Sequence, residues 1–181
     1  MDRIGEIDGV YHLDPAHSAL GFTVRHAGLS RVRGTFDVCP GYAIIDSENV
    51  HDSAVMVRIS AATINTMVPD RDAHLRSADF FDAEQFPTLD FVSTGVRYEK
   101  GDFLVDGDLT IRGITKPVSF ELDFGGFGTD PYGNYKAGAS AKTVINREDF
   151  GLTWNAALET GGVLVGKDVT INLDLQGSLQ Q

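Results

Sequence analysis

The amino-acid sequence predicts an all-β protein, an antiparallel barrel of about eight strands that contains one short helical insert. Three observations lead to this fold class. Apolar and polar residues alternate with a period of two in most of the chain, as in strands with one buried and one solvated face. Twenty glycines in 181 residues favour the many turns of an antiparallel fold. The alternation stops between residues 68 and 92, where a helical start signal appears.

Residues 1–10 are expected to form a lead-in, and residues 11–181 are expected to form one barrel domain. Asp14-Pro15 interrupts the first strand, and Pro40-Gly41 and Gly113 mark turns. The segment 125–134, GGFGTDPYGN, is predicted to be a long hairpin loop. The predicted strands cover residues 11–13, 19–26, 33–39, 42–45, 54–61, 88–98, 103–112, 117–124, 136–145 and 169–175.

One predicted strand carries almost no side-chain bulk. Ala137, Ala139 and Ala141 share one face, and Gly138 and Ser140 lie on the other. Such a strand leaves space beside it. A neighbouring element can pack closely there, or the strand can form the wall of a cavity, and the sequence favours the two equally.

The insert at 68–92 holds four of the eleven phenylalanines, Phe80, Phe81, Phe86 and Phe91. Pro69 and Asp70 suit the positions just before and at a helix N-cap, and Leu75, Ala78 and Phe81 recur at threes. Proline at 87 ends the segment. An aromatic helix inside a β chain is expected to plug, cap or gate the barrel.

The bulk composition excludes several functions. A net charge of −11 argues against nucleic acid and equally against adhesion to an anionic membrane surface. No stretch is long enough to span a bilayer, and residues 1–14 show no apolar run resembling a signal peptide. The single cysteine, Cys39, requires no oxidising compartment. We therefore expect a cytoplasmic protein.

Candidate catalytic and metal-binding patterns are weak. Asp14, His17 and Ser18 lie close together, but adjacent residues of a strand point to opposite faces, which disfavours a triad. We expect Asp14 and Ser18 to cap a turn and His17 to make a structural hydrogen bond. The five histidines lack metal-ligand spacing, and no phosphate-binding glycine motif is present.

Four stretches resemble one known family. They are YHLDPAHSALGFTVRHAGLSRVRGTF (11–36), INTMVPDRDAHLRSADFFDAEQFPTLDFVST (64–94), VDGDLTIRGITKPV (105–118) and INREDFGL (145–152). In family order they cover most of residues 11–175, and the chain resembles the YceI-like, polyisoprenoid-binding, lipocalin-like proteins. The resemblance implies an extended eight-stranded antiparallel barrel, closed by the helical insert, around a long apolar tunnel. It also implies a homodimer. Many members carry signal peptides, a feature that this sequence lacks.

The leading hypothesis is non-catalytic binding, sequestration or carriage of an elongated apolar lipid: a polyisoprenoid, an isoprenoid quinone, a fatty acid or a fatty amide. No cofactor is expected beyond such a bound isoprenoid or acyl lipid. Aromatic and apolar residues are predicted to line the tunnel, and polar ones to meet the polar end of the ligand. The predicted tunnel wall consists of Phe22, Phe36, Leu75, Phe80, Phe81, Phe86, Phe91, Phe120 and Trp154. The residues predicted to meet the polar end are His17, Arg71, Asp72, Asn146 and Arg147.

Two other functions stay open at this point. One is an enzyme that acts on a hydrophobic small molecule, with His17 or Asp72 as the acid or base. The other is a stress-related structural module whose barrel is packed full and binds no ligand. Within the insert, Phe80, Phe81 and Phe86 are interpreted as wall and lid, and Arg71-Asp72 as a polar anchor.

Overall fold

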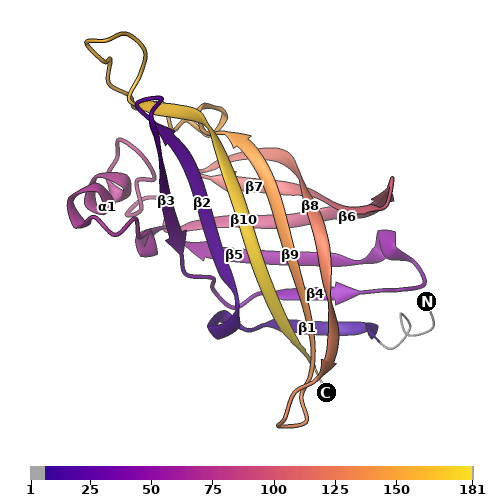
Figure 1. Cartoon of the computed structure of the whole chain (residues 1–181). Helices are drawn as coiled ribbons and strands as arrows, with labels where there is room; N and C mark the ends of the chain where they lie inside the picture. Colours follow the sequence, from indigo (N-terminus) through magenta and orange to yellow (C-terminus); the bar gives the residue numbers. More distant parts are fainter. Residues whose placement is uncertain (1–6, 181) are drawn as a thin grey trace.

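The computed structural model describes residues 7–180, which form a single ten-stranded antiparallel sheet (Figure 1). Eight of the strands close into a ring, because β1 pairs with both β4 and β10. The order is β1-β4-β5-β6-β7-β8-β9-β10, and β2 and β3 extend the sheet from β10. The strands are β1 (Gly9–Leu13), β2 (Ala19–His26), β3 (Ser30–Phe36), β4 (Tyr42–Ile45), β5 (Ala54–Ser60), β6 (Thr88–Glu99), β7 (Asp102–Ile111), β8 (Ile114–Thr129), β9 (Tyr135–Asn146) and β10 (Val165–Leu179). The eight-stranded antiparallel barrel is thereby confirmed.

The last strand closes the ring with two different partners on the same side. Its first part pairs with β2, from Val165 to Asp174, and its end pairs with β1, from Gly177 to Leu179. Beyond β3, an isolated bridge joins Val38 to Ile59 of β5. Figure 1 shows β2, β3, β8, β9 and β10 crossing over the group β4–β7. The space between these two groups of strands holds the core.

The predicted alternation assigns the two faces of the strands correctly. In β2, Leu20, Phe22 and Val24 face the interior, and Arg25 is exposed. The buried side chains form one cluster inside the ring. Removal of these apolar surfaces from water is the main force that stabilises the barrel.

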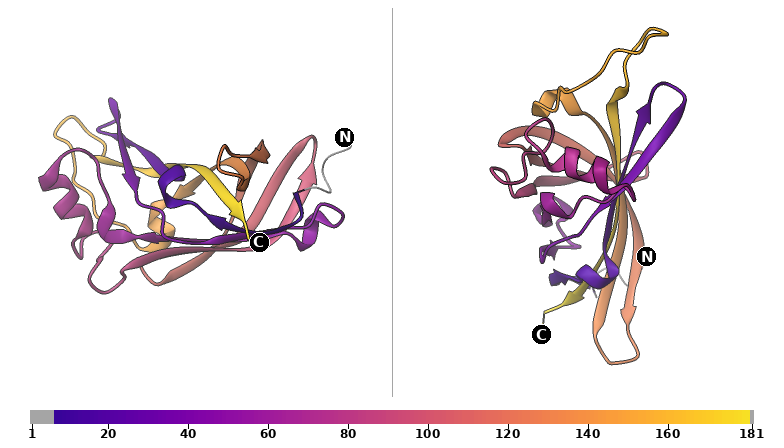
Figure 2. Two further views of the ribbon diagram at one scale, coloured as in Figure 1. Left: turned by 90° about the horizontal axis from the view of Figure 1, so that it is seen from below. Right: turned by 90° about the vertical axis from the view of Figure 1, so that its left-hand side faces the viewer.

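The helix α1 (Pro69–Arg76) covers one end of the barrel, the end that faces the viewer on the right of Figure 2. Val68 is the N-cap residue and Pro69 occupies the first helical turn, so the predicted capping by Asp70 is wrong. The helix ends before Ala78, so the predicted helical spacing to Phe81 is also wrong. A series of turns brings Phe81 to the core instead. No helix among the described residues is long and apolar enough to cross a membrane.

Between the strands that the structure describes lie four short 3-10 helices: η2 (Pro15–His17), η3 (Val50–Asp52), η4 (Ala61–Thr63) and η5 (Arg147–Phe150). The segment 125–134 is not a long loop, because β8 continues to Thr129 and pairs with β9 up to Tyr135. Glycines in β8 allow this close pairing: a side chain at Gly125 would lie 3.3 Å from the carbonyl oxygen of Gly138. The turn shrinks to residues 130–134.

The start of the barrel lies earlier than the sequence predicted. Strand β1 begins at Gly9, and the side chain of Ile7 is buried. Residues 7–10 of the predicted lead-in therefore belong to the barrel. Residues 1–6 lie outside the described part of the chain.

Candidate functional site

The interior of the barrel contains two apolar cavities placed end to end. The first has a volume of about 130 Å³ and lies beneath the helical insert; we name it the lid compartment. The second, the far compartment, has a volume of about 270 Å³. Four residues line both cavities: Val57, Phe91, Phe120 and Leu173. These four residues, the waist, separate the two compartments.

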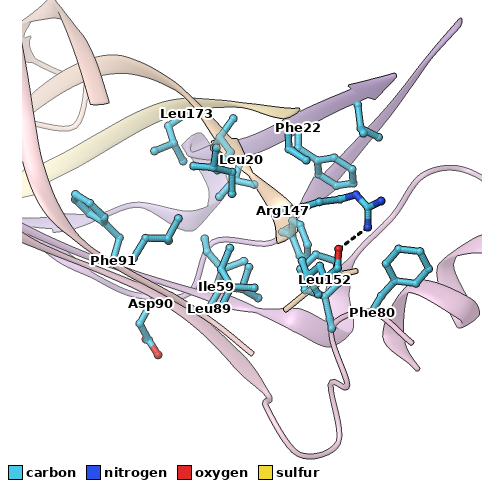
Figure 3. Close-up of a pocket in the computed structure, with 18 of the residues that line it drawn as sticks. Leu20, Phe22, Ile59, Phe80, Leu89, Asp90, Phe91, Arg147, Leu152 and Leu173 are labelled. Carbon is cyan, nitrogen blue, oxygen red and sulfur yellow. Dashed lines mark hydrogen bonds between the residues drawn. The ribbon is translucent and has the colours of Figure 1, made fainter. Parts of the chain in front are cut away.

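Six phenylalanines are among the residues that line the lid compartment, and Figure 3 labels Phe22, Phe80 and Phe91. Phe36 of β3 packs between Phe22 and Phe81, with ring centroids 5.6 Å and 5.5 Å away. The ring of Phe22 occupies the space above Gly34, its partner on β3, where an added side chain would meet the ring at 2.4 Å. Phe80, from the turns after α1, completes the wall on the side of the insert.

One cation lies in the wall of the lid compartment. Arg147 is 4% exposed, and Figure 3 shows its guanidinium among the lining side chains. Burial lowers the pKa of Arg147, and the charge of Glu148 opposes this shift. No carboxylate among the described residues forms an ion pair with this guanidinium. The site therefore combines an apolar space with a buried positive charge.

Backbone carbonyl groups hold Arg147 in place. Its Nε donates to Gly166 (2.8 Å), and its Nη1 donates to Leu152 and to Trp154 (3.0 Å). Nη2 donates one bond to Val165 (3.3 Å). A guanidinium has five N–H donors, so these four bonds leave one of them without a protein acceptor among the described residues.

The strand with small side chains forms a wall of the far compartment. Ala137, Gly138, Ala139 and Ala141 of β9 all line this cavity. Of the two equally favoured interpretations of that strand, the cavity wall is therefore the correct one. The space exists because these residues of β9 contribute no side chain larger than a methyl group.

The waist is closed by two phenylalanine rings. Phe91 and Phe120 contact each other edge to face, with centroids 5.1 Å apart and planes at 77°. The ring of Phe91 occupies the space beside Gly107, where an added side chain would lie 2.4 Å from the ring and 2.6 Å from the carbonyl oxygen of Val92. This packing leaves Phe91 little freedom to move aside.

Eight of the fourteen predicted site residues line the lid compartment: Phe22, Phe36, Leu75, Phe80, Phe81, Phe91, Phe120 and Arg147. Phe86 and Trp154 line neither cavity. Phe86 packs against Gly113 on the outside of the wall. Trp154 packs against His74 and Phe80, with ring centroids 4.7 Å and 5.3 Å away. These two rings support the lid from behind.

The predicted polar anchor, Arg71-Asp72, is a local network around Thr66. Asp72 accepts hydrogen bonds from the Thr66 backbone N–H (2.8 Å) and hydroxyl (2.5 Å). Arg71 donates to the Thr66 hydroxyl (2.7 Å) and carbonyl oxygen (2.8 Å). Neither side chain lines a cavity. The pair fastens the start of α1 to the preceding loop and is not placed to meet a ligand.

The other polar candidates also lie away from the cavities. Asn146 is the N-cap of η5 and accepts from the Glu148 N–H (3.0 Å). His17 is exposed and lies 2.8 Å from a carboxylate oxygen of Asp14, a hydrogen bond that lowers the pKa of Asp14. Asp14 also caps η2, and Ser18 bonds the backbone of Gln176. His17 and Asp14 therefore contact each other, and neither side chain lines a cavity.

Of the predicted site residues, Phe91 and Phe120 of the waist line the far compartment, and the rest of its lining was missed. Tyr11, Phe103 and Phe124 line it, together with Leu175 of β10. The signal was present in the sequence, because Phe103 and Phe124 fall on the apolar faces of their predicted strands, and the strand of Phe124 precedes the strand with small side chains. Within residues 7–180, no group of three or more His, Cys, Asp or Glu residues is arranged to hold a metal ion.

The family model of the YceI-like domain matches residues 11–177. The chain belongs to the YceI-like family. A UPF0312 protein of Staphylococcus aureus strain MSSA476 is 37% identical over 172 residues, which cover 94% of this chain and 98% of that protein.

Solved structures share the fold. BcnA of Burkholderia cenocepacia superimposes with a TM-score of 0.76 at 20% identity, covering 91% of this chain and 98% of BcnA. A polyisoprenoid binding domain from Saccharophagus degradans, implicated in plant cell wall breakdown, gives a TM-score of 0.69 at 16% identity. That match covers 94% of this chain and 98% of the other. At these identities the likeness concerns the fold alone.

Proposed function

We propose that this protein binds and carries an elongated apolar lipid, without catalysis, inside the barrel. The candidate ligands are a polyisoprenoid, an isoprenoid quinone, a fatty acid or a fatty amide. The observation that carries the proposal is the pair of apolar cavities in series within a closed ring of strands. A fully packed structural module would have side chains in this space.

The volumes favour a ligand that occupies both compartments. A cavity of about 150 Å³ lined by apolar side chains holds one benzene molecule. The lid compartment, at about 130 Å³, is of that size, and the far compartment is about twice as large. A chain that passes the waist gains buried surface in both, at about 25 cal/mol per Å² before association costs.

The ligand's polar end is proposed to face Arg147. The guanidinium keeps its charge at neutral pH, has no carboxylate partner among residues 7–180 and retains one free N–H. The accessible lining of the cavity is apolar, so an anionic or carbonyl head group would reach past it to supply the missing acceptor. Arg71 and Asp72 do not support this role, since both are engaged with Thr66.

Lipid extraction tests the proposal directly. Protein purified without detergent is extracted with organic solvent, and the extract is examined by mass spectrometry. We expect a long-chain lipid in stoichiometric amount. An extract without lipid, from protein that also fails to take up any of the four lipid classes, would contradict the proposed function.

A filled cavity should abolish binding. Ala139→Phe places a ring in the far compartment, between Phe124 and Leu175, its partners on β8 and β10. Co-purified lipid should fall at least about tenfold, because the chain loses the larger compartment. The matched control is Val144→Phe on the outer face of the same strand, where Val144 is 57% exposed. Equal lipid content in both variants would exclude the far compartment as a binding site.

The enzyme alternative is not favoured by the geometry. The Asp14–His17 pair lies on the surface, and Asp72 is directed at Thr66. The cytoplasmic location stays a prediction from the sequence, and the homodimer stays an expectation from the family resemblance. Light scattering of the purified protein measures the second.

A further inference from the structure

We propose that the β2–β3 hairpin is a docking surface for an anionic lipid bilayer. Three arginines, Arg25, Arg31 and Arg33, lie on its outer face, and an exposed leucine, Leu29, lies at its tip. We name Arg25, Arg31 and Arg33 the arginine face. This surface goes beyond the cavity that the proposed function uses.

The register of the hairpin groups the three cations. Arg25 is directly opposite Arg31, and Arg33 is two residues further along β3 on the same face. Directly opposed side chains of antiparallel strands lie about 5 Å apart at Cβ, so the charges are neighbours. All three residues are exposed, and none forms an ion pair with a carboxylate among residues 7–180.

Folding alone does not account for this arrangement. Like charges directly opposite each other destabilise a strand pair, so Arg25 and Arg31 weaken the hairpin. Charged residues on an edge strand do prevent unwanted strand pairing, which explains Arg31 and Arg33 on β3. Protection of an edge does not explain Arg25, because β2 is not an edge strand: it pairs with β10 on one side and with β3 on the other.

The tip of the hairpin adds an apolar element. Leu29 is 90% exposed and follows a turn in which Ala27 (φ 52°) and Gly28 (φ 69°) both have positive φ, as in a type I′ turn. The neighbouring loop exposes Val163, and a hydrogen bond from Ala27 to Leu164 (2.7 Å) joins this loop to the turn. A phosphate-rich polymer would bind the arginines but leave Leu29 in water. A bilayer satisfies both, because its anionic head groups cover an apolar layer.

The surface lies close to the lid compartment. The inner face of the same hairpin supplies Leu20, Phe22 and Val24 to the compartment wall. Figure 1 shows the turn between β2 and β3 and the 155–164 loop together at one end of the molecule. A bilayer bound there would touch the other side of a strand pair that lines the cavity.

The net charge of the whole chain does not describe this surface. A charge of −11 repels an anionic surface on average, yet the arginine face forms a local positive area. The Debye length is about 8 Å at physiological salt, so acidic residues farther than this from the arginine face interact only weakly with the lipid head groups bound there. The β8–β9 hairpin offers a contrast, because its tip exposes Tyr132 (90%) beside the carboxylate of Asp130.

Vesicle co-sedimentation tests the inference. The full chain is mixed with vesicles of equal parts phosphatidylglycerol and phosphatidylcholine, and with vesicles of phosphatidylcholine alone. We expect binding to the anionic vesicles only, with loss of binding in about 0.5 M NaCl. The double variant Arg31→Gln with Arg33→Gln should bind about twenty-five-fold less, about fivefold for each charge. Arg25 is left in place, because it lies on β2, whose pairing with both β10 and β3 the test should not disturb.

Matched controls separate the surface from net charge. Lys100→Gln with Lys116→Gln removes the same charge from exposed positions elsewhere and should bind as the wild type does. Leu29→Ser should weaken binding about tenfold, and Tyr132→Ser should not change it. Circular dichroism verifies that each variant is folded. Equal binding of the two double variants, no binding by the wild type, or binding of a short DNA duplex that survives Leu29→Ser would each overturn the inference.

Discussion

The two compartments of the barrel are formed by the same sheet in opposite ways. Around the lid compartment, large rings from β2, β3 and the insert leave about 130 Å³ between them. In the far compartment, the alanines and glycine of β9 leave about 270 Å³. The wall of the lid compartment also holds the buried charge of Arg147 behind its apolar surface, whereas no buried cation among the described residues lines the far compartment.

This difference shows how a barrel of fixed strand number can control its interior. An eight-stranded ring has room for packed side chains or for one small ligand. Substituting side chains on a single strand changes the free volume without altering the hydrogen bonds of the sheet. The compartments can therefore specialise, one for a polar end and one for an apolar chain, and the waist decides whether they act together.

The largest effect is expected from opening the waist. Phe120→Ala removes one of the two contacting rings and should lower the free energy of unfolding by about 3–5 kcal/mol, measured by urea denaturation. It also joins the compartments, so longer lipid chains should bind more tightly. Phe120→Leu keeps most of the volume and should cost less than about 1.5 kcal/mol. An unchanged preference for chain length in the alanine variant would show that Phe120 does not separate the cavities.

The next effect concerns the lid compartment alone. Arg147→Met leaves the carbonyl groups of Gly166, Leu152 and Trp154 without their donor, and should lower stability by about 2–4 kcal/mol. The variant should lose the preference for a fatty acid over its methyl ester.

The control for this change is Arg112→Met. Arg112 also donates to two carbonyl groups, those of Gly151 (3.1 Å) and Ala78 (2.8 Å), but it lines neither cavity. It should cost less stability and leave the preference intact. A wild type that binds acid and ester equally would argue against Arg147 as the partner of the polar end.

A smaller effect is expected at the glycine beneath the waist. Gly107→Ala places a methyl group 2.4 Å from the Phe91 ring and 2.6 Å from the Val92 carbonyl oxygen, so the ring must move. Thermal unfolding should report a loss of about 1–3 kcal/mol. Gly95→Ala, on the strand that carries Phe91, meets no atom within 4 Å and should be close to neutral. Equal losses for the two would indicate a general intolerance of alanine in the sheet.

The smallest effect lies on the outer wall of the far compartment. Hydrogen bonds from Arg97 and then Ser119 lower the pKa of Asp106 from 3.8 to about 2. The ionised form is therefore stabilised by folding: its contribution is complete above about pH 4 and is lost as the pH falls toward 2. Solvent screening limits the contribution to about 1 kcal/mol.

Stability measured against pH tests this contribution. Asp106→Asn should flatten the curve between pH 4 and 2, by about 1 kcal/mol. Asp108→Asn changes the next outward residue of β7, which is exposed, and should leave the slope as it is. If the stability of the Asp106 variant depends on pH as that of the wild type does, other carboxylates are responsible for the acid sensitivity.

The sequence predicted the strands well because each strand has one wet and one dry face. Leu20, Phe22 and Val24 are a clear case, since their alternation requires no knowledge of the neighbours. The end of β8 was missed because its glycines also suit a loop, and only pairing with β9 keeps them extended. Likewise Phe81 fits a helical spacing, but the helix ends at Arg76.

The site was harder to predict than the fold. Aromatic residues were assigned to the cavity wall by type, which holds for Phe22 and Phe36 but fails for Phe86 and Trp154. Both of these pack behind the wall, a distinction that depends on how the insert folds back. The separation into two compartments depends on Phe91 of β6 meeting Phe120 of β8 over the intervening strand β7, a contact that no local pattern contains.

The seam between β1 and β10 has a consequence for how the molecule assembles. His12 and Gln180, which flank this seam, are hydrogen-bonded although they are 168 residues apart in the chain. A contact of such sequence separation has a high loop-closure entropy and slows folding. The β6–β9 meander can form from neighbouring segments, but the ring cannot close until its two ends meet. A newly made chain therefore passes through an open sheet whose apolar lining faces water, and a lipid present at that moment could be enclosed rather than threaded in.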